Sequence, residues 1–462
     1  MYFVHLLKKM TEKGAVRRAL SLPNFGKRRP QASLDKAGST VLTDGKVSHT
    51  PHPSWPLPLR NGIRVIRGVM GLLNRSTVDE QLFQRVRAIE RVLGATSPTG
   101  RGTQIDKVYI LRRQDIVLSS DGMTAEEAKG SIKAEWVSFR DAASEEPRNE
   151  DSVILYLHGG AYCMASRKTH RGITWKLAKY ANCRVLSVDY RLAPEHVFPL
   201  AIQDALSAYS FLVNPPAGAK KYAPEKVVFM GDSAGGGLCL ATILWLRDHG
   251  MEHGLPMPGG AALLSPWLDL SHSMDSFRTN ARYDILPDKV KDRILTENRN
   301  HYYIKDNSFL KNPLVSPLFS TESELTPLPP MCIHIGELER LRDENLAFYI
   351  HVFKNSRIQM ELYESQIHVF QLFNTIYPFA DESLKRYGEF VKRVTSTNFQ
   401  PDQFERSIVK ISHADGYPTS PLTIDAVEAL LGGQRKPEES VVLKGLMMKE
   451  PEADKKSGFQ IG

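Results

Sequence analysis

The chain has 462 residues, 42% hydrophobic and 24% charged, which is the balance of a globular protein with a large core. We find no run of about 18 apolar residues that would predict a transmembrane helix, and no secretory signal pattern. The net charge of +8 lies in residues 1–60, which carry 11 Lys or Arg and 3 Asp or Glu. Because the remainder is balanced, a basic surface for nucleic acid is not expected.

Residues 1–55 form a basic leader rich in Pro, Ser and Lys, for which we expect little fixed structure. A transit peptide and a tether to an anionic membrane surface are the alternatives. We expect a cytoplasmic protein, with peripheral membrane association through the leader as an option.

Residues 56–105 are predicted to be a helical cap segment. Residues 59–73 place their larger apolar side chains on one helical face, which indicates a helix that either packs on the protein or lies on a membrane surface. Thr77–Glu80 is a capping box that begins a second helix.

Residues 106–397 are predicted to be the catalytic domain. Two strands, at about 107–118 and 131–139, precede a regular alternation of strands and helices. The later strands are expected at 153–157, 184–188, 226–230, 261–264, 331–335 and 359–363, and the helices at 169–180, 200–212, 234–248, 343–354 and 382–394. The alternation predicts an α/β fold with a mostly parallel central sheet and helices on both faces.

Two segments depart from this rhythm. Residues 268–325 are polar and aromatic, which indicates a cap insertion between two strands. Residues 398–462 are predicted to be a polar, largely disordered tail, with a short helix at about 423–431.

Residues 231–235 read Gly-Asp-Ser-Ala-Gly and lie between a predicted buried strand and a predicted helix. A strand, a tight turn and a helix form the setting of a nucleophile elbow, with Ser233 exposed at the turn. The glycines permit a turn in which a Cβ would clash. The alternative is that Ser233 only caps the helix.

The segment that begins His158-Gly159-Gly160 directly follows the strand at 153–157. Backbone N–H groups of the two glycines, together with that of Ala234, could bind the oxyanion of a tetrahedral intermediate. A plain Gly-Gly turn at the end of the strand is the alternative.

An activated serine requires a base and a carboxylate that orients the base. His368 follows the last predicted strand of the domain after a short loop, where a base is expected. Glu337, Glu339 and Asp343 all follow the preceding strand. Their spacing does not choose between Glu337 and Glu339, while Asp343 also suits the first turn of the next helix.

Four cysteines lie in apparent core segments, and none has the spacing of metal ligands. They are Cys163, Cys183, Cys239 and Cys332. We expect buried free thiols and no metal site, with one disulfide as the alternative.

Taken together, five stretches resemble the hormone-sensitive-lipase-like family of α/β-hydrolases, which includes arylacetamide deacetylases and fungal steryl acetyl hydrolases. They occur in the family's order within about residues 150–395. They are residues 158–162, 189–199, 231–235, 265–270 and 367–370. The resemblance implies an α/β-hydrolase fold, a catalytic triad, serine-dependent ester hydrolysis and no cofactor.

The chain departs from the family pattern at two positions. The family's oxyanion motif has a third glycine where this chain has Ala161, which still offers a backbone N–H. The family's acidic motif places the catalytic acid at the position of Glu339, which is usually Asp, with Asp343 as the alternative. The resemblance therefore implies a triad of Ser233, Glu339 and His368.

We therefore expect a carboxylic ester hydrolase of the esterase, lipase or deacetylase kind, acting on a small-molecule ester of hydrophobic character. The alternative is a non-catalytic small-molecule receptor on the same fold. Gibberellin receptors resemble this family but lack the catalytic histidine, whereas His368 is present here.

Overall fold

The computed structural model describes residues 51–73, 97–116, 129–140, 148–286, 301–321 and 328–432, with a few positions between 84 and 118 and two short strands near the N-terminus. The chain divides into two compact units, Met1–Ser48 and His49–Gly462. In the first, β1 (Ala32–Leu34) pairs antiparallel with β2 (Thr40–Leu42). The rest of the expected leader up to residue 50, the capping box at 77–80 and the tail beyond 432 lie outside the described residues.

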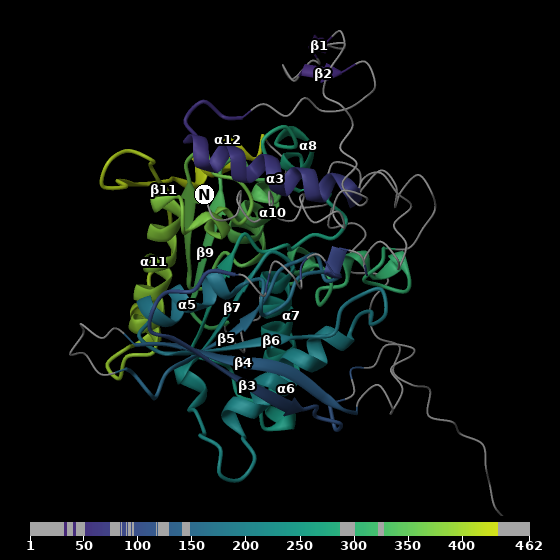
Figure 1. Cartoon of the computed structure of the whole chain (residues 1–462), viewed down its shortest axis with the longest axis vertical. Coiled ribbons are helices and arrows are strands. Elements are labelled where there is room, and N and C mark those ends of the chain that lie inside the picture. Colours follow the sequence, from purple (N-terminus) through teal and green to yellow (C-terminus); the bar gives the residue numbers. More distant parts are fainter. Residues whose placement is uncertain are drawn as a thin grey trace, which may run out of the picture. The chain divides into compact units, whose positions relative to one another are not determined.

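The second unit is built on one ten-stranded sheet in the order β12-β11-β10-β9-β8-β7-β5-β6-β4-β3 (Figure 1). Neighbours from β6 through β11 run parallel, and the pairs β3–β4, β4–β6 and β11–β12 are antiparallel. The strands are β3 (Thr103–Leu111), β4 (Ser131–Phe139), β5 (Val153–Leu157), β6 (Arg184–Asp189), β7 (Val227–Asp232), β8 (Gly260–Leu264), β9 (Met331–Gly336), β10 (Ile358–Tyr363), β11 (Ser407–Ile411) and β12 (Thr419–Pro421). The expected mostly parallel sheet is confirmed.

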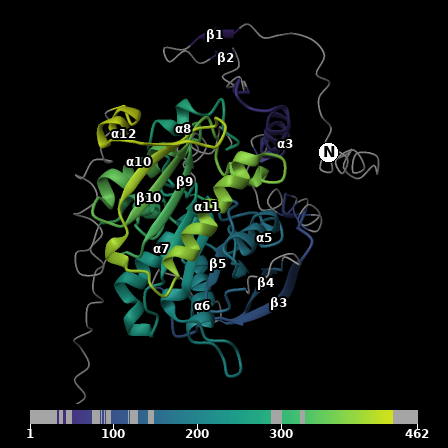
Figure 2. The same ribbon diagram turned by 90° about the vertical axis from the view of Figure 1, so that its left-hand side faces the viewer.

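Helices cover both faces of this sheet (Figure 2). The α-helices are α3 (Leu57–Leu73), α5 (Arg171–Tyr180), α6 (Leu200–Val213), α7 (Ala234–His249), α8 (Ser276–Thr279), α10 (Arg342–Ala347), α11 (Pro378–Val394) and α12 (Ile424–Leu430). Helices α6 and α7 pack on one face, and α5 and α11 pack on the other. None of the described helices is long and apolar enough to cross a membrane.

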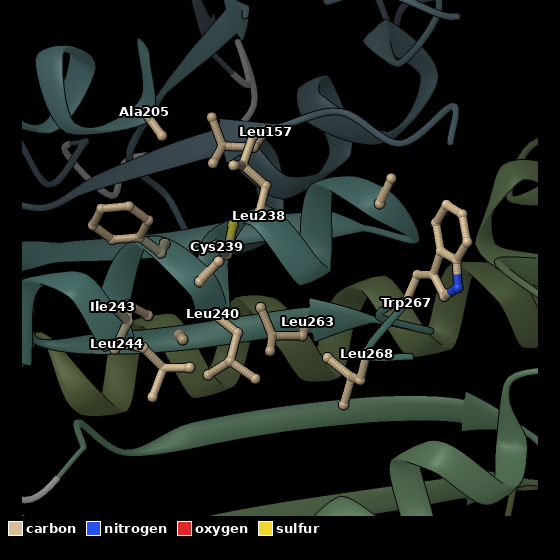
Figure 3. Packing of buried hydrophobic residues seen from close by; sticks show 14 of the residues in the cluster. Leu157, Ala205, Leu238, Cys239, Leu240, Ile243, Leu244, Leu263, Trp267 and Leu268 are labelled. Carbon is tan, nitrogen blue, oxygen red and sulfur yellow. The ribbon is translucent and has the colours of Figure 1, made fainter. Parts of the chain in front are cut away.

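The central strand β5 shows why the sheet requires both helical layers. All five of its side chains are buried. Because successive side chains of a strand point to opposite faces, Leu155 and Leu157 belong to the core beneath α6 and α7, while Ile154 and Tyr156 belong to the core beneath α5 and α11. Figure 3 shows Leu157 beside the apolar side chains of α7.

The predicted segments match the observed strands and helices closely, with two exceptions. The first strand runs over Thr103–Leu111 rather than 107–118, although Ile116 and Leu118 are buried in the core beyond its end. The helix expected at 343–354 is α-helical only through Ala347 and continues as a π-helical turn over Phe348–Val352.

The expected disorder from residue 398 onward is wrong for residues 398–432. Strand β11 pairs parallel with β10, and β12 returns antiparallel to it. Ile408 and Ile411 of β11 are buried, which accounts for its order. The short helix expected at 423–431 is observed as α12.

Two segments expected to cover the site pack closely on the domain. In the described parts of the insertion, Leu268, Phe277 and Tyr303 join the main core. Leu59 and Ile63 of α3 are buried in a cluster with residues that flank His368 in sequence. Helix α3 thus packs on the protein, as one of the two expectations for residues 59–73 stated.

Candidate functional site

Ser233 lies in a sharp turn between β7 and α7, with φ 53° and ψ −123°. The turn depends on its glycines, since a Cβ on Gly235 would approach the carbonyl oxygen of Leu157 to 2.1 Å and one on Gly231 would approach that of Gly235 to 2.5 Å. The backbone N–H of Ser233 donates to the carbonyl of Leu264 at 2.9 Å. The serine is therefore held at the carboxyl end of the sheet in a left-handed conformation, as in a nucleophile elbow.

The loop after β10 brings His368 to this serine, 135 residues away in sequence. Nε2 of His368 lies 2.8 Å from Oγ of Ser233. The next residue, Val369, has φ 46°, which is strained for a β-branched side chain. Burial lowers the pKa of His368, against the opposing effect of the Asp284 and Asp232 carboxylates. A neutral imidazole at neutral pH can accept a proton from Ser233.

Glu339 lies in the loop between β9 and α10 and is fully buried. Its Oε2 accepts hydrogen bonds from the Ser265 hydroxyl at 2.6 Å and from the Gly336 backbone N–H at 2.8 Å. Among the described residues, neither its Oε1 nor Nδ1 of His368 has a hydrogen-bond partner. Burial raises the pKa of Glu339 to about 8. The structure thus brings Glu339 into the site region without a bond to His368.

The other two candidate acids have different partners. Glu337 accepts the backbone N–H of Ser365 at 2.9 Å and pairs with Lys410 at 2.7 Å. Asp343 accepts the backbone N–H of Ser276 at 2.9 Å and pairs with Arg342. Their oxygens are therefore engaged away from His368.

The glycine-rich loop after β5 differs from the sequence prediction at Gly159. Its backbone N–H donates to Oδ1 of Asp232 at 3.0 Å, so it is not free to bind an oxyanion. A Cβ on Gly159 would lie 2.2 Å from Oδ2 of that carboxylate, which is why the position requires glycine. The prediction that Gly159 is an oxyanion donor is therefore wrong, and the glycine instead permits close packing against Asp232.

The next two residues of the loop present unused donors. Gly160 has φ 107° and Ala161 has φ 51°. Within the described part of the chain, the backbone N–H groups of Gly160, Ala161 and Ala234 donate to no protein acceptor. Successive N–H groups around left-handed residues form concave anion-binding sites. These three groups are therefore the candidate oxyanion donors, with Ala161 in place of Gly159.

Asp232 is the centre of a buried network that sequence reasoning missed. Besides the Gly159 N–H, it accepts the Tyr156 hydroxyl at 2.6 Å and lies 3.2 Å from Nε2 of His170. Burial alone would lower the pKa of His170, but the Asp232 carboxylate outweighs it and raises that pKa. The only signal in the sequence was a carboxylate directly before the serine.

Ser265 and Asp284 were also missed as parts of the site. The Ser265 hydroxyl, besides donating to Glu339, accepts the Val369 backbone N–H at 3.1 Å. Asp284 accepts the His368 backbone N–H at 3.1 Å. Ser265 belongs to one of the family-like stretches and Asp284 to the insertion, and neither sequence position by itself indicates a contact with the loop of His368.

The described residues hold no group of three or more His, Cys, Asp or Glu side chains that could bind a metal ion. All four cysteines are free and buried.

Comparisons with known proteins place this geometry in a family. A model of the α/β-hydrolase fold family matches residues 154–372. An acetyl-hydrolase from Streptomyces hygroscopicus is 32% identical over 267 residues, which cover 58% of this chain and 81% of that protein. An esterase from Acinetobacter venetianus is 33% identical over 239 residues, covering 52% of this chain and 74% of that protein.

Solved structures of esterases resemble this chain in fold and in sequence. An esterase from the bacterial hormone-sensitive lipase family has a TM-score of 0.57 and 28% sequence identity, and the match covers 74% of this chain and 100% of that one. The protein EstE5, from a crystal soaked with p-nitrophenyl butyrate, has a TM-score of 0.56 and 27% identity over 74% of this chain and 99% of its own. The receptor alternative finds no support in these relatives. These similarities agree with the nucleophile elbow at Ser233 and with the loop that brings His368 to it. The chain belongs to the hormone-sensitive-lipase-like family of α/β-hydrolases, and it is a carboxylic ester hydrolase.

Proposed function

We propose that this ester hydrolase works through an acyl-enzyme on Ser233, with His368 as general base and Glu339 as the acid that orients it. The observation that carries the proposal is the 2.8 Å contact between Nε2 of His368 and Oγ of Ser233. That distance suits direct proton transfer from the hydroxyl to the imidazole.

In the first step, Oγ of Ser233 attacks the ester carbonyl carbon while Nε2 of His368 takes the hydroxyl proton. The carbonyl oxygen becomes an oxyanion, which the N–H groups of Gly160, Ala161 and Ala234 stabilise. The intermediate collapses, the bond to the leaving alcohol breaks, and His368 returns its proton to that alcohol. An acyl group then remains on Ser233.

Deacylation repeats these steps with water as the nucleophile. His368 takes a proton from water as its oxygen attacks the acyl carbon, and the same N–H groups stabilise the second oxyanion. Collapse breaks the bond to Ser233, whose Oγ recovers a proton from His368. The products are a carboxylic acid and the free serine.

Glu339 is the best supported acid because its Oε1 and Nδ1 of His368 are both buried and have no hydrogen-bond partner in the part of the chain that the structure describes. Buried polar atoms rarely stay unpaired, and catalytic hydrogen bonds often tighten only when substrate is bound. A buried carboxyl whose pKa is raised to about 8 is stabilised as a carboxylate when a positive charge forms beside it. His368 becomes that charge when it accepts the Ser233 proton.

A hydrophobic ester is the substrate class that the surroundings of the loop favour. Ala161 of the oxyanion loop and Tyr302 both pack against a small apolar cluster that includes Cys163, and the rings of Tyr162 and Tyr303 stack with centroids 3.8 Å apart. Such apolar surroundings favour an ester without charge near its carbonyl. Because one relative is named an acetyl-hydrolase, an ester with a short acyl group is the form we propose to test first.

The test compares hydrolysis of p-nitrophenyl acetate, butyrate and decanoate by the wild type and by Ser233→Ala. We expect the variant to lose activity by at least about a thousandfold. Ser187→Ala is the matched control, since Ser187 is buried on β6 and its hydroxyl has no described partner. Equal activity of wild type and Ser233→Ala would contradict the proposal. Acetylated sterols, assayed beside the p-nitrophenyl esters, distinguish a sterol deacetylase from a general carboxylesterase.

Peripheral membrane association through the basic leader is proposed on charge alone. Deleting residues 2–50 tests it and leaves Trp55 in place, whose Nε1 donates to the carbonyl of Ser365 at 2.6 Å. We expect the deletion to reduce sedimentation with anionic liposomes and to leave hydrolysis of soluble esters unchanged. Equal sedimentation of both proteins would contradict a tether.

A further inference from the structure

One buried carboxylate joins the loop of the proposed base to the loop of the proposed acid. Asp284 lies in the insertion, far in sequence from both loops, and its side chain is fully buried. Its Oδ1 accepts the backbone N–H of His368 at 3.1 Å, and its Oδ2 accepts that of Arg340 at 2.6 Å. Arg340 directly follows Glu339. The two oxygens of one carboxylate thus fix the base residue and the neighbour of the acid.

We propose that Asp284 is a positioning residue for ester hydrolysis, which sets the distance between the loops of Glu339 and His368 and supplies a negative charge near the imidazole. The inference rests on the proposed function of those two residues. Asp284 contacts no reacting atom and affects the reaction only through the position and charge state of His368.

The carboxylate is itself held in place from two sides. Its Oδ1 also accepts the backbone N–H of Ile285 at 2.7 Å. The carbonyl oxygen of Asp284 accepts Nε of Arg67, from helix α3, at 2.8 Å. A buried acceptor with three backbone donors and an anchored main chain has little freedom to move, so the loops that it holds share that rigidity.

The charges around His368 define what removing this one would do. Asp284 approaches from the insertion, Asp232 from β7 and Glu339 from the loop after β9. The first two carboxylates favour the protonated imidazole, with Asp284 the stronger, while burial lowers the pKa of His368 overall. On the side of α3, the Arg67 guanidinium binds the Asp284 carbonyl rather than the imidazole. Neutralising Asp284 should therefore lower the pKa of His368 further.

If Asp284 had only a structural role, its loss would reduce the amount of folded protein, but each folded active site would work as in the wild type. A structural role and a positioning role therefore differ in kcat per active site and in the acid limb of the pH profile. Positioning predicts that kcat falls while KM stays nearly unchanged, because loop displacement disturbs the transition state more than substrate binding. The lost charge predicts that the acid limb moves to lower pH.

The experiment measures kcat, KM and the pH dependence of kcat/KM for p-nitrophenyl butyrate with Asp284→Asn. Active sites are counted by titration with a fluorophosphonate. We expect kcat per site to fall about 10- to 100-fold, KM to change by less than about threefold, and the acid limb to move down by roughly half a pH unit or more.

Asp269→Asn is the matched control. Asp269 is another fully buried carboxylate of the same insertion, and it accepts the backbone N–H groups of Ser271 at 2.8 Å and Ser273 at 2.7 Å. Neither of those serines belongs to the proposed triad or oxyanion donors. We expect this variant to keep the wild-type kcat per site and acid limb.

Wild-type kcat per site and an unmoved acid limb in Asp284→Asn would overturn the proposal, as would equal changes in both variants. If Asp284→Asn does not fold, Asp284→Glu decides. It keeps the charge on a longer side chain, so positioning predicts a reduced kcat per titrated site with an unmoved acid limb, and a structural role predicts wild-type kcat. Failure of the proposed function is separate: the fluorophosphonate would then label no Ser233 even in the wild type.

Discussion

The two halves of the site are built by different means. Around Ser233 the structure depends on glycines that let backbones approach closely, as at Gly231 and Gly235. Around His368 it depends on hydrogen bonds that backbone N–H groups donate to side chains distant in sequence, such as Asp284 and Ser265. The first half is fixed by short-range sterics, and the second by polar contacts between loops.

This difference separates the expected results of mutation. A change on the serine side acts on packing, so it should alter both stability and activity. A change on the histidine side acts on proton transfer and loop position, so it should alter activity and its pH dependence with a smaller effect on folding.

The largest effect is expected for His368→Ala. Without a base the Ser233 hydroxyl keeps its proton, and kcat should fall by about 10⁴- to 10⁶-fold. Thermal unfolding should change little by comparison, since Nδ1 of His368 makes no hydrogen bond to the described residues. Steady-state kinetics and calorimetry measure the two quantities. A loss of kcat below tenfold would remove His368 from the mechanism.

Glu339→Gln should have the next largest effect. The amide cannot stabilise the imidazolium as a carboxylate does, so we expect kcat to fall by about 10³- to 10⁴-fold. Asp343→Asn is the comparison, because its carboxylate is occupied by Ser276 and Arg342. Steady-state kinetics of the two variants decide between Glu339 and Asp343 as the catalytic acid. A larger loss for Asp343→Asn than for Glu339→Gln would reverse the assignment of the acid.

On the serine side, Gly159→Ala should reduce both stability and rate. The new Cβ would lie 2.2 Å from Oδ2 of Asp232, so we expect a loss of about 1–3 kcal/mol in the free energy of unfolding. The displaced loop should also lower kcat about 10-fold or more. Ala161→Gly is the control, since it keeps the backbone donor at a position with φ 51°. Denaturant titration measures the free energy of unfolding of both variants. Unchanged stability of Gly159→Ala would contradict the packing role of this glycine.

The smallest effect is a displacement of the pH profile. His368 must be neutral to act as base, and burial puts its pKa below the ordinary value of 6.5. The contribution of neutral His368 should therefore be present above this lowered pKa and be lost as the pH falls through it. In Glu339→Gln, where no carboxyl group titrates at that position, the acid limb of kcat/KM should have its midpoint below pH 6.5. A midpoint at pH 7 or higher in that variant would contradict a buried neutral base.

The same contrast explains which parts of the molecule the sequence predicts. The turn at residues 231–235 can be predicted from the sequence, because its glycines and the flanking strand and helix are adjacent in the chain. His368 could be selected because a base is expected after the strand that follows the acid. Both features are local patterns or follow from chain order.

The remainder depends on tertiary contacts. Gly159 was expected to be an oxyanion donor because nothing in the sequence shows that Asp232 occupies its N–H. Strand β11 was missed because five residues in polar surroundings become a strand only when Ile408 and Ile411 are covered beside β10. Asp284 lies about 84 residues before His368, and no spacing rule joins them.

The central claim is that catalysis passes through an acyl group on Ser233. Rapid acid quenching of a reaction with p-nitrophenyl butyrate, followed by peptide mass spectrometry, measures this directly. We expect a butyryl group on the peptide that contains Ser233 in the wild type, and none on the corresponding peptide of Ser233→Ala. A butyryl group on a different residue during turnover, with that peptide unmodified, would contradict it.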